Sequence, residues 1–108
     1  MTDLEMMKFC AEAMKIPIIE TGNKLGIYKM GVYIPGDDYD PLRDDAQAFA
    51  LDTYITKAGC SIFISELEFV VWRTGADDVY QSFLDSNKLE ESLRRVRVEA
   101  VAKIQAAK

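Results

Sequence analysis

The chain has 108 residues, of which 49% are hydrophobic and 29% charged, and its net charge is −5. This size and composition predict one folded domain, residues 1–108, and the negative charge argues against a nucleic-acid binder, because such domains are usually basic. No histidine is present, which removes the commonest general base and zinc ligand. Cys10 and Cys60 lie in apolar contexts and predict buried thiols in a reducing compartment. With no expected signal peptide and no apolar run long enough for a membrane span, we expect a cytoplasmic protein.

The first predicted element is a helix over residues 2–15. Thr2 and Glu5 have the spacing of a capping box, in which each side chain accepts a hydrogen bond from the other residue's amide. Pro17 blocks continuation of the helix. Its expected buried stripe consists of Leu4, Met7, Cys10, Ala11 and Met14.

Two strands are predicted next, over residues 16–20 and 25–34, with a turn at residues 21–24. The turn is short, so we expect the strands to pair in antiparallel fashion. One side of the second strand is uniformly apolar, which predicts that it faces the core. That side carries Tyr28, Met30, Val32 and Ile34.

Five aspartates in residues 37–45 precede a predicted helix over residues 44–58. A calcium loop would require a glycine and a final glutamate that this stretch lacks, although a magnesium site, which needs only one or two carboxylates, remains an alternative. Asp44 with Gln47 three residues later fits a helix cap, and Gly59 fits the end of the helix. We therefore favour helix initiation over a metal or acid–base site.

Residues 60–73 form the most strand-like run, and their length predicts a hairpin or bend near residues 65–67. A loop is expected at residues 74–78, and residues 79–84 fit either a short strand or one helical turn. Asn87 and Glu90 predict the start of a last helix. Its expected buried stripe consists of Leu89, Leu93, Val96, Ala100, Ile104 and Ala107.

The predicted order is therefore α-β-β-α-β-β-α. This order indicates an α+β fold, a layered alpha-beta-alpha sandwich with a small, mostly antiparallel sheet. We see no phosphate-binding loop, nucleophile motif or metal-ligand cluster, so no catalytic, cofactor-binding or metal-binding residues are predicted.

The candidate binding residues are arginines of the last helix and the end of the strand run. A basic cluster on a helix is usually a solvated face, but it could also contact the acidic stretch of residues 37–45, in the same chain or in a second subunit. Tryptophan and arginine are favoured at protein interfaces, whereas core packing is the commoner fate of a tryptophan in a strand. The candidates are Trp72, Arg73, Arg94, Arg95 and Arg97.

The segment YDPLRDDAQAFAL at residues 39–51 and the closing helix RRVRVEAVAKIQAAK resemble the small phage ABA-sandwich domain proteins, and more distantly NinX-like phage proteins. Gln47 replaces a frequent second acid of that family, and residues 98–101 follow its terminal pattern only loosely. The matching positions are Tyr39, Asp40, Pro41, Leu42, Asp45, Ala48 and Leu51.

The resemblance implies an alpha-beta-alpha sandwich from a phage or prophage and supplies no catalytic residues. We expect a non-enzymatic accessory protein that binds a host or phage protein and forms a homodimer. The alternative is an inhibitor of a host defence system that sequesters a nucleotide or binds a nuclease, and a small enzyme is a third hypothesis.

Overall fold

The computed structural model describes the backbone of residues 1–73 and 78–108, and their side chains except those of residues 33–35 and 78. Three α-helices, six strands and one 3-10 turn make up the described chain. In chain order they are α1 (Asp3–Ala13), β1 (Ile18–Thr21), β2 (Lys24–Lys29), β3 (Val32–Asp38), α2 (Asp45–Lys57), β4 (Cys60–Ile64), β5 (Glu68–Arg73), β6 (Asp78–Phe83), the 3-10 turn Ser86–Lys88, and α3 (Leu89–Ala106).

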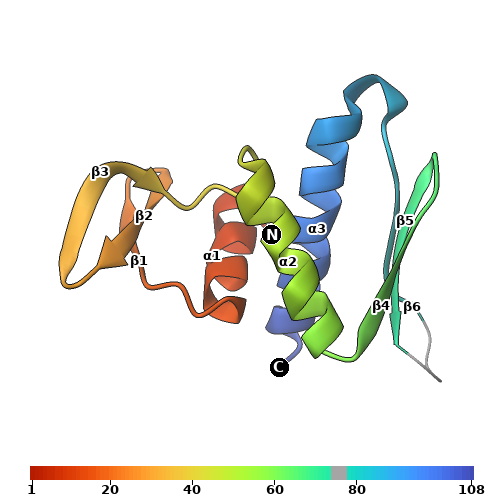
Figure 1. Cartoon of the computed structure of the whole chain (residues 1–108), viewed down its shortest axis with the longest axis horizontal. Coiled ribbons are helices and arrows are strands. Elements are labelled where there is room, and N and C mark those ends of the chain that lie inside the picture. The colour runs from red at the N-terminus through yellow and green to blue at the C-terminus, as the bar shows by residue number, and fades with distance from the viewer. Residues whose placement is uncertain (74–77) are drawn as a thin grey trace.

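The strands form two antiparallel three-stranded sheets, β1-β2-β3 and β4-β5-β6, with the helices between them (Figure 1). Helix α3 packs against both α1 and α2, the sheet β4–β6 packs on α2 and α3, and β2 contacts α1. The α+β class is thus confirmed. The structure differs from expectation in having two sheets instead of one and an extra strand in each half.

The core is built around α3. More sides of this helix are buried than the single apolar stripe predicted from the sequence. Contacts with α1, α2 and β6 surround it, and its alanines allow close approach of the neighbouring helices. The expected ends of the stripe, Leu89 and Ala107, are exposed. The buried residues of α3 are Val96, Arg97, Val98, Ala100, Val101, Ala102 and Ile104.

The helix starts agree with the sequence in two cases of three. The capping box of Thr2 and Glu5 is present, and Asp44 caps α2. The start predicted at Asn87 is wrong: Asp85 accepts a hydrogen bond from the amide of Asn87 and caps the 3-10 turn, and α3 begins at Leu89 without a side-chain cap.

The strand predicted over residues 25–34 is also wrong, because it is the hairpin β2–β3. Met30 and Gly31 both have positive φ, 49° and 81°, as a tight two-residue hairpin turn requires. Of the face expected to be buried, Tyr28 and Val32 are exposed and Met30 is fully so, while the side chain of Ile34 lies outside the described residues. The core contact of this sheet comes from the other end of β2, where Leu25 is buried.

The second half follows the sequence more closely. The hairpin expected within residues 60–73 is confirmed as β4–β5, and the undecided segment at residues 79–84 is the strand β6. The loop expected at residues 74–78 lies, up to residue 77, outside the described residues. Among the described residues, no helix is both long and apolar enough to cross a membrane.

Candidate interaction surface

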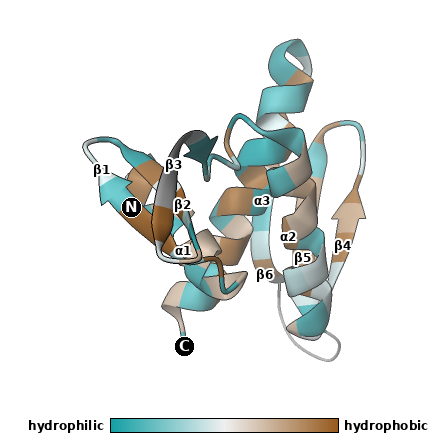
Figure 2. Ribbon diagram, turned by 60° about the vertical axis from the view of Figure 1, so that its left-hand side comes forward, coloured by the Kyte–Doolittle hydropathy of each residue, from teal (hydrophilic) through white to brown (hydrophobic). Residues whose placement is uncertain are grey.

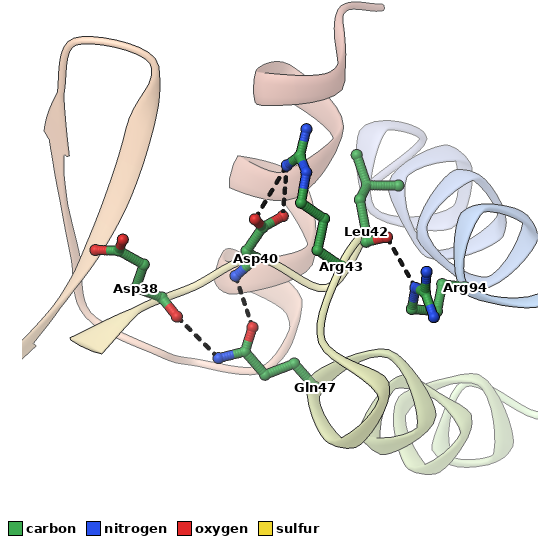
Figure 3. A network of polar contacts seen from close by, with 6 residues as sticks. All are labelled: Asp38, Asp40, Leu42, Arg43, Gln47 and Arg94. Carbon is green, nitrogen blue, oxygen red and sulfur yellow. Dashed lines mark hydrogen bonds and ion pairs between the residues drawn. The ribbon is translucent and has the colours of Figure 1, made fainter. Parts of the chain in front are cut away.

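The acidic stretch before α2 is held by hydrogen bonds to the helix itself (Figure 3). Asp44 Oδ1 accepts a hydrogen bond from the Gln47 amide at 2.9 Å, as expected of a cap. The Gln47 side chain does not complete a reciprocal box. Its Nε2 donates to the Asp38 carbonyl at 3.0 Å and its Oε1 accepts from the Asp40 amide at 2.6 Å. Gln47 therefore fastens the end of β3 to the start of α2.

The charged side chains of the same stretch form ion pairs within the chain. Arg43 Nη1 bonds both carboxylate oxygens of Asp40, at 3.1 and 3.0 Å. Arg94 Nη1 pairs with Asp45 at 2.8 Å. Arg94 Nε donates to the Leu42 carbonyl at 2.9 Å (Figure 3). The acidic stretch and the basic helix thus meet in one molecule. Among the described residues, no group of three acidic or cysteine side chains is arranged to hold a metal ion.

Arg97 is buried, contrary to the expectation that the charges of the last helix lie off its buried face. Only 5% of it is exposed, and its Nε donates to Asp52 at 2.9 Å while Nη1 donates to the Leu93 carbonyl at 3.0 Å. Its guanidinium carbon lies 4.6 Å from the centre of the Phe49 ring and 5.6 Å from that of Phe69. Each of the three guanidinium nitrogens donates a hydrogen bond within the chain, so Arg97 is a structural residue.

Arg94 and Arg95 come together at a pocket of about 290 Å³, which Arg43 also lines. Arg95 is exposed and pairs with Asp3 at 2.8 Å and with Glu99 at 3.4 Å. Each of the three guanidinium groups therefore already has a carboxylate partner. The pocket offers an anion no uncompensated positive charge.

A second pocket, of about 440 Å³, lies beside Tyr39, between α1, the end of β3 and the start of β2. Its lining includes Lys24 and Arg43 together with Asp38 and Asp40, two basic and two acidic residues. A lining of this kind favours neither an anion nor a cation.

The reactive groups of the core are kept neutral by burial. Burial raises the pKa of the Cys10 thiol to about 12, and the thiol contacts the Val98 carbonyl at 3.5 Å. Burial also raises the pKa of Tyr80 to about 12 and that of Tyr39 further still. Cys10 therefore lacks the thiolate that a nucleophile needs at neutral pH.

Trp72 and Arg73 lie on the sheet β4–β6, whereas the other three candidate residues, all arginines, lie on α3. Phe69 and Val71 of the central strand β5 are fully buried against the helices, so the alternating residues, Val70 and Trp72, face outward. Trp72 is half-buried and is not part of the core, and Arg73 is exposed. The structure separates these two from Arg94, Arg95 and Arg97.

The outer face of this sheet carries two exposed aromatic side chains, Phe63 and Phe83, that are not among the five candidate binding residues. Phe63 of β4 is paired in register with Val70, and Phe83 of β6 with Glu68. Their exposed fractions are 51% and 77%. We name the set Phe63, Val70, Trp72 and Phe83 the outer apolar face. Its sequence signal was the run FVVW, apolar on both sides of one strand, in contrast to the alternation of a sheet with one face in water.

Fold and surface together define a small α+β protein in which Arg94, Arg95 and Arg97 pair with carboxylates of the same chain. Both sheets expose apolar side chains, and two exposed phenylalanines lie on the outer face of β4–β6. No protein-family model, curated protein or solved structure matches the chain.

Proposed function

We propose that the chain is a non-enzymatic accessory protein of a phage or prophage that acts in the host cytoplasm by binding a host or phage protein. The phage setting rests on the resemblance carried by residues 39–51 and the closing helix. The binding role rests on the outer apolar face. A contiguous apolar patch rimmed by polar residues is a common mark of a protein-binding surface.

The aromatic residues of this face suit such a role. Phe83 and Phe63 expose large apolar areas, and Trp72 stands half-buried between the strands, which is typical of the side chains that anchor a partner. Glu68 and Gln81, which are paired in register with Phe83 and Val70 and lie on the same face, would form the polar rim. The single observation that carries the proposal is the exposure of Phe83.

The test is affinity capture from host lysate with matched lysine variants. Phe83→Lys removes an aromatic side chain from the outer apolar face, whereas Met30→Lys changes an even more exposed apolar side chain in the turn between β2 and β3 of the other sheet. We expect a captured protein to be lost with Phe83→Lys and retained with Met30→Lys. Equal capture by both variants would contradict the assignment of this face.

The second candidate function is sequestration of an anionic ligand such as a nucleotide. The feature that supports it is the pocket lined by Arg43, Arg94 and Arg95, where a nucleotide would have to displace the carboxylates that already pair with these arginines. Calorimetric titration of the protein with ATP distinguishes the two functions. Binding that Arg95→Ala abolishes would support the second candidate, and no binding would favour the first.

We propose in addition that the protein is a homodimer. The opposite charges of the acidic stretch and the last helix no longer support this association, because Arg94 and Asp45 pair within one chain. The unpaired edge of β4 supports it instead.

A further inference from the structure

We infer that two copies of the chain associate through β4, whose free edge pairs in antiparallel fashion with the same strand of a second copy. This inference deepens the proposed homodimer by naming its interface, and it does not depend on the partner proposed for the outer apolar face. The product would be one continuous sheet of six strands across the two molecules.

Within the part of the chain that the structure describes, β4 pairs only with β5 and forms the outer border of its sheet (Figure 2). The backbone groups that point outward follow from the register. The Ser65 amide donates a hydrogen bond to the Glu68 carbonyl at 2.9 Å, so Ser65 and Glu68 are a hydrogen-bonded pair of the β4–β5 hairpin. Every second residue of an antiparallel strand bonds to the same neighbour, and the β4–β5 ladder has no bulge to interrupt this alternation. Ser61 and Phe63 therefore bond to β5. The amides and carbonyls of Cys60, Ile62 and Ile64 face the free edge.

Among the sheet edges, β4 is the one without a protecting residue. Natural proteins block edge strands with charges, prolines or bulges. β1 carries Glu20, β3 carries Pro35 and two aspartates, and β6 begins with Asp78. The sequence of β4, CSIFI, has no charge, proline or glycine. An apolar edge of this kind is a template for another strand.

A second copy fits this edge better than an unrelated strand because β4 is complementary to itself. Pairing about a two-fold axis at Ile62 places Ile62 opposite its own copy. It also places Phe63 opposite Ser61 of the partner, and Ile64 opposite Cys60 of the partner, so each large side chain meets a small one. Every outward amide in β4 then donates a hydrogen bond to the second copy and every outward carbonyl accepts one, since hydrogen-bonded antiparallel pairs exchange both bonds.

The charges that flank the strand are also complementary. Lys57 precedes one end of β4 and Glu66 follows the other, both are exposed, and neither forms an ion pair among the described residues. Antiparallel association brings Lys57 of each copy to the end occupied by Glu66 of the other. Two equivalent ion pairs at the rim follow from the symmetry.

Sedimentation equilibrium of the full chain tests the interface. We expect the wild type to sediment as a dimer at micromolar concentration. Phe63→Lys places a charge on the edge strand and should raise the dimer dissociation constant at least about tenfold. Phe83→Lys lies on the same face but on the far strand, so it should leave the constant unchanged. A monomeric wild type, or equal weakening by both variants, would overturn the inference.

A charge exchange tests the antiparallel register and the identity of the occupant. Lys57→Glu and Glu66→Lys should each weaken the dimer about fivefold, and the double variant should restore it, because the opposite charges then meet again. Single and double variants that weaken association equally would exclude this pairing. If the chain proves to be monomeric, the capture experiment with Phe83→Lys still tests whether the outer apolar face binds a host protein. The two proposals can therefore be disproved independently.

Discussion

Arg97 and Asp52 form an ion pair of 2.9 Å in which the arginine side chain is only 6% exposed and the aspartate 37%. The pair joins α3 to α2, and Phe49 and Phe69 flank the guanidinium group. A buried arginine held this way fixes the relative position of two helices. It also removes one of the charges that the sequence offered to a ligand.

Breaking this pair from the aspartate side should be costly. Asp52→Ala leaves the Arg97 charge buried without its carboxylate, and we expect a loss of about 3 kcal/mol in the free energy of unfolding. Asp3→Ala removes the partner of Arg95 at an exposed site and should cost about 1 kcal/mol or less. Urea denaturation of both variants checks the contrast. Similar losses for the two would show that Arg97 is no more dependent on its partner than Arg95 is.

The cap of α2 makes a second prediction. Asp44→Ala should lower the free energy of unfolding by about 1 kcal/mol, whereas Asp44→Asn should be nearly neutral because asparagine caps equally well. Calcium or magnesium should leave the melting temperature of the wild type unchanged. A rise of several degrees in the melting temperature with either ion would support a metal site in the acidic stretch instead.

The apolar contacts of α3 make a third prediction. Ile104 is buried in the core, and Ile104→Ala should cost about 2–5 kcal/mol of stability. Leu89, at the start of the same helix, is exposed, and Leu89→Ala should be within about 0.5 kcal/mol of the wild type. Thermal and urea unfolding measure both. A large loss at Leu89 would mean that the start of the helix is covered, for example by a second molecule.

Burial of Cys10 predicts a specific dependence of stability on alkaline pH. The folded-state pKa of about 12 lies above that of an ordinary thiol, so the unfolded chain loses the proton first as the pH rises. The contribution of Cys10 is complete below the unfolded pKa, near 9, and falls by about 1.4 kcal/mol per pH unit between there and the folded pKa. Cys10→Ala should therefore show a shallower loss of stability between pH 8 and 10.5. Parallel curves for the variant and the wild type would contradict this burial.

The elements that local chemistry specifies were predicted from the sequence. The capping box of Thr2 and the cap at Asp44 depend on neighbouring residues, and both are present. The hairpin at residues 30–31 was missed because Met-Gly is a weak turn signal and the apolar alternation continues through it. A sequence pattern shows which side of a strand is apolar, but it does not show whether anything lies against that side.

The candidate site was predicted less well, for the same reason. The burial of Arg97 depends on Asp52, 45 residues earlier in the chain, and no local pattern announces that contact. Phe83 stood in a segment whose secondary structure was undecided, so its place on the outer face could not be derived. Trp72 was predicted as a candidate binding residue together with four arginines. In the structure it shares the outer face of its sheet with Val70 and Phe63 instead.

Native mass spectrometry of the tagged wild-type chain, purified gently from host lysate, tests the central claim most directly. If the arginines serve the fold and the outer apolar face binds protein, the measured mass should correspond to the chain with a bound protein partner and without a small anionic ligand. A chain that carries only a nucleotide or another small anion would contradict both proposals.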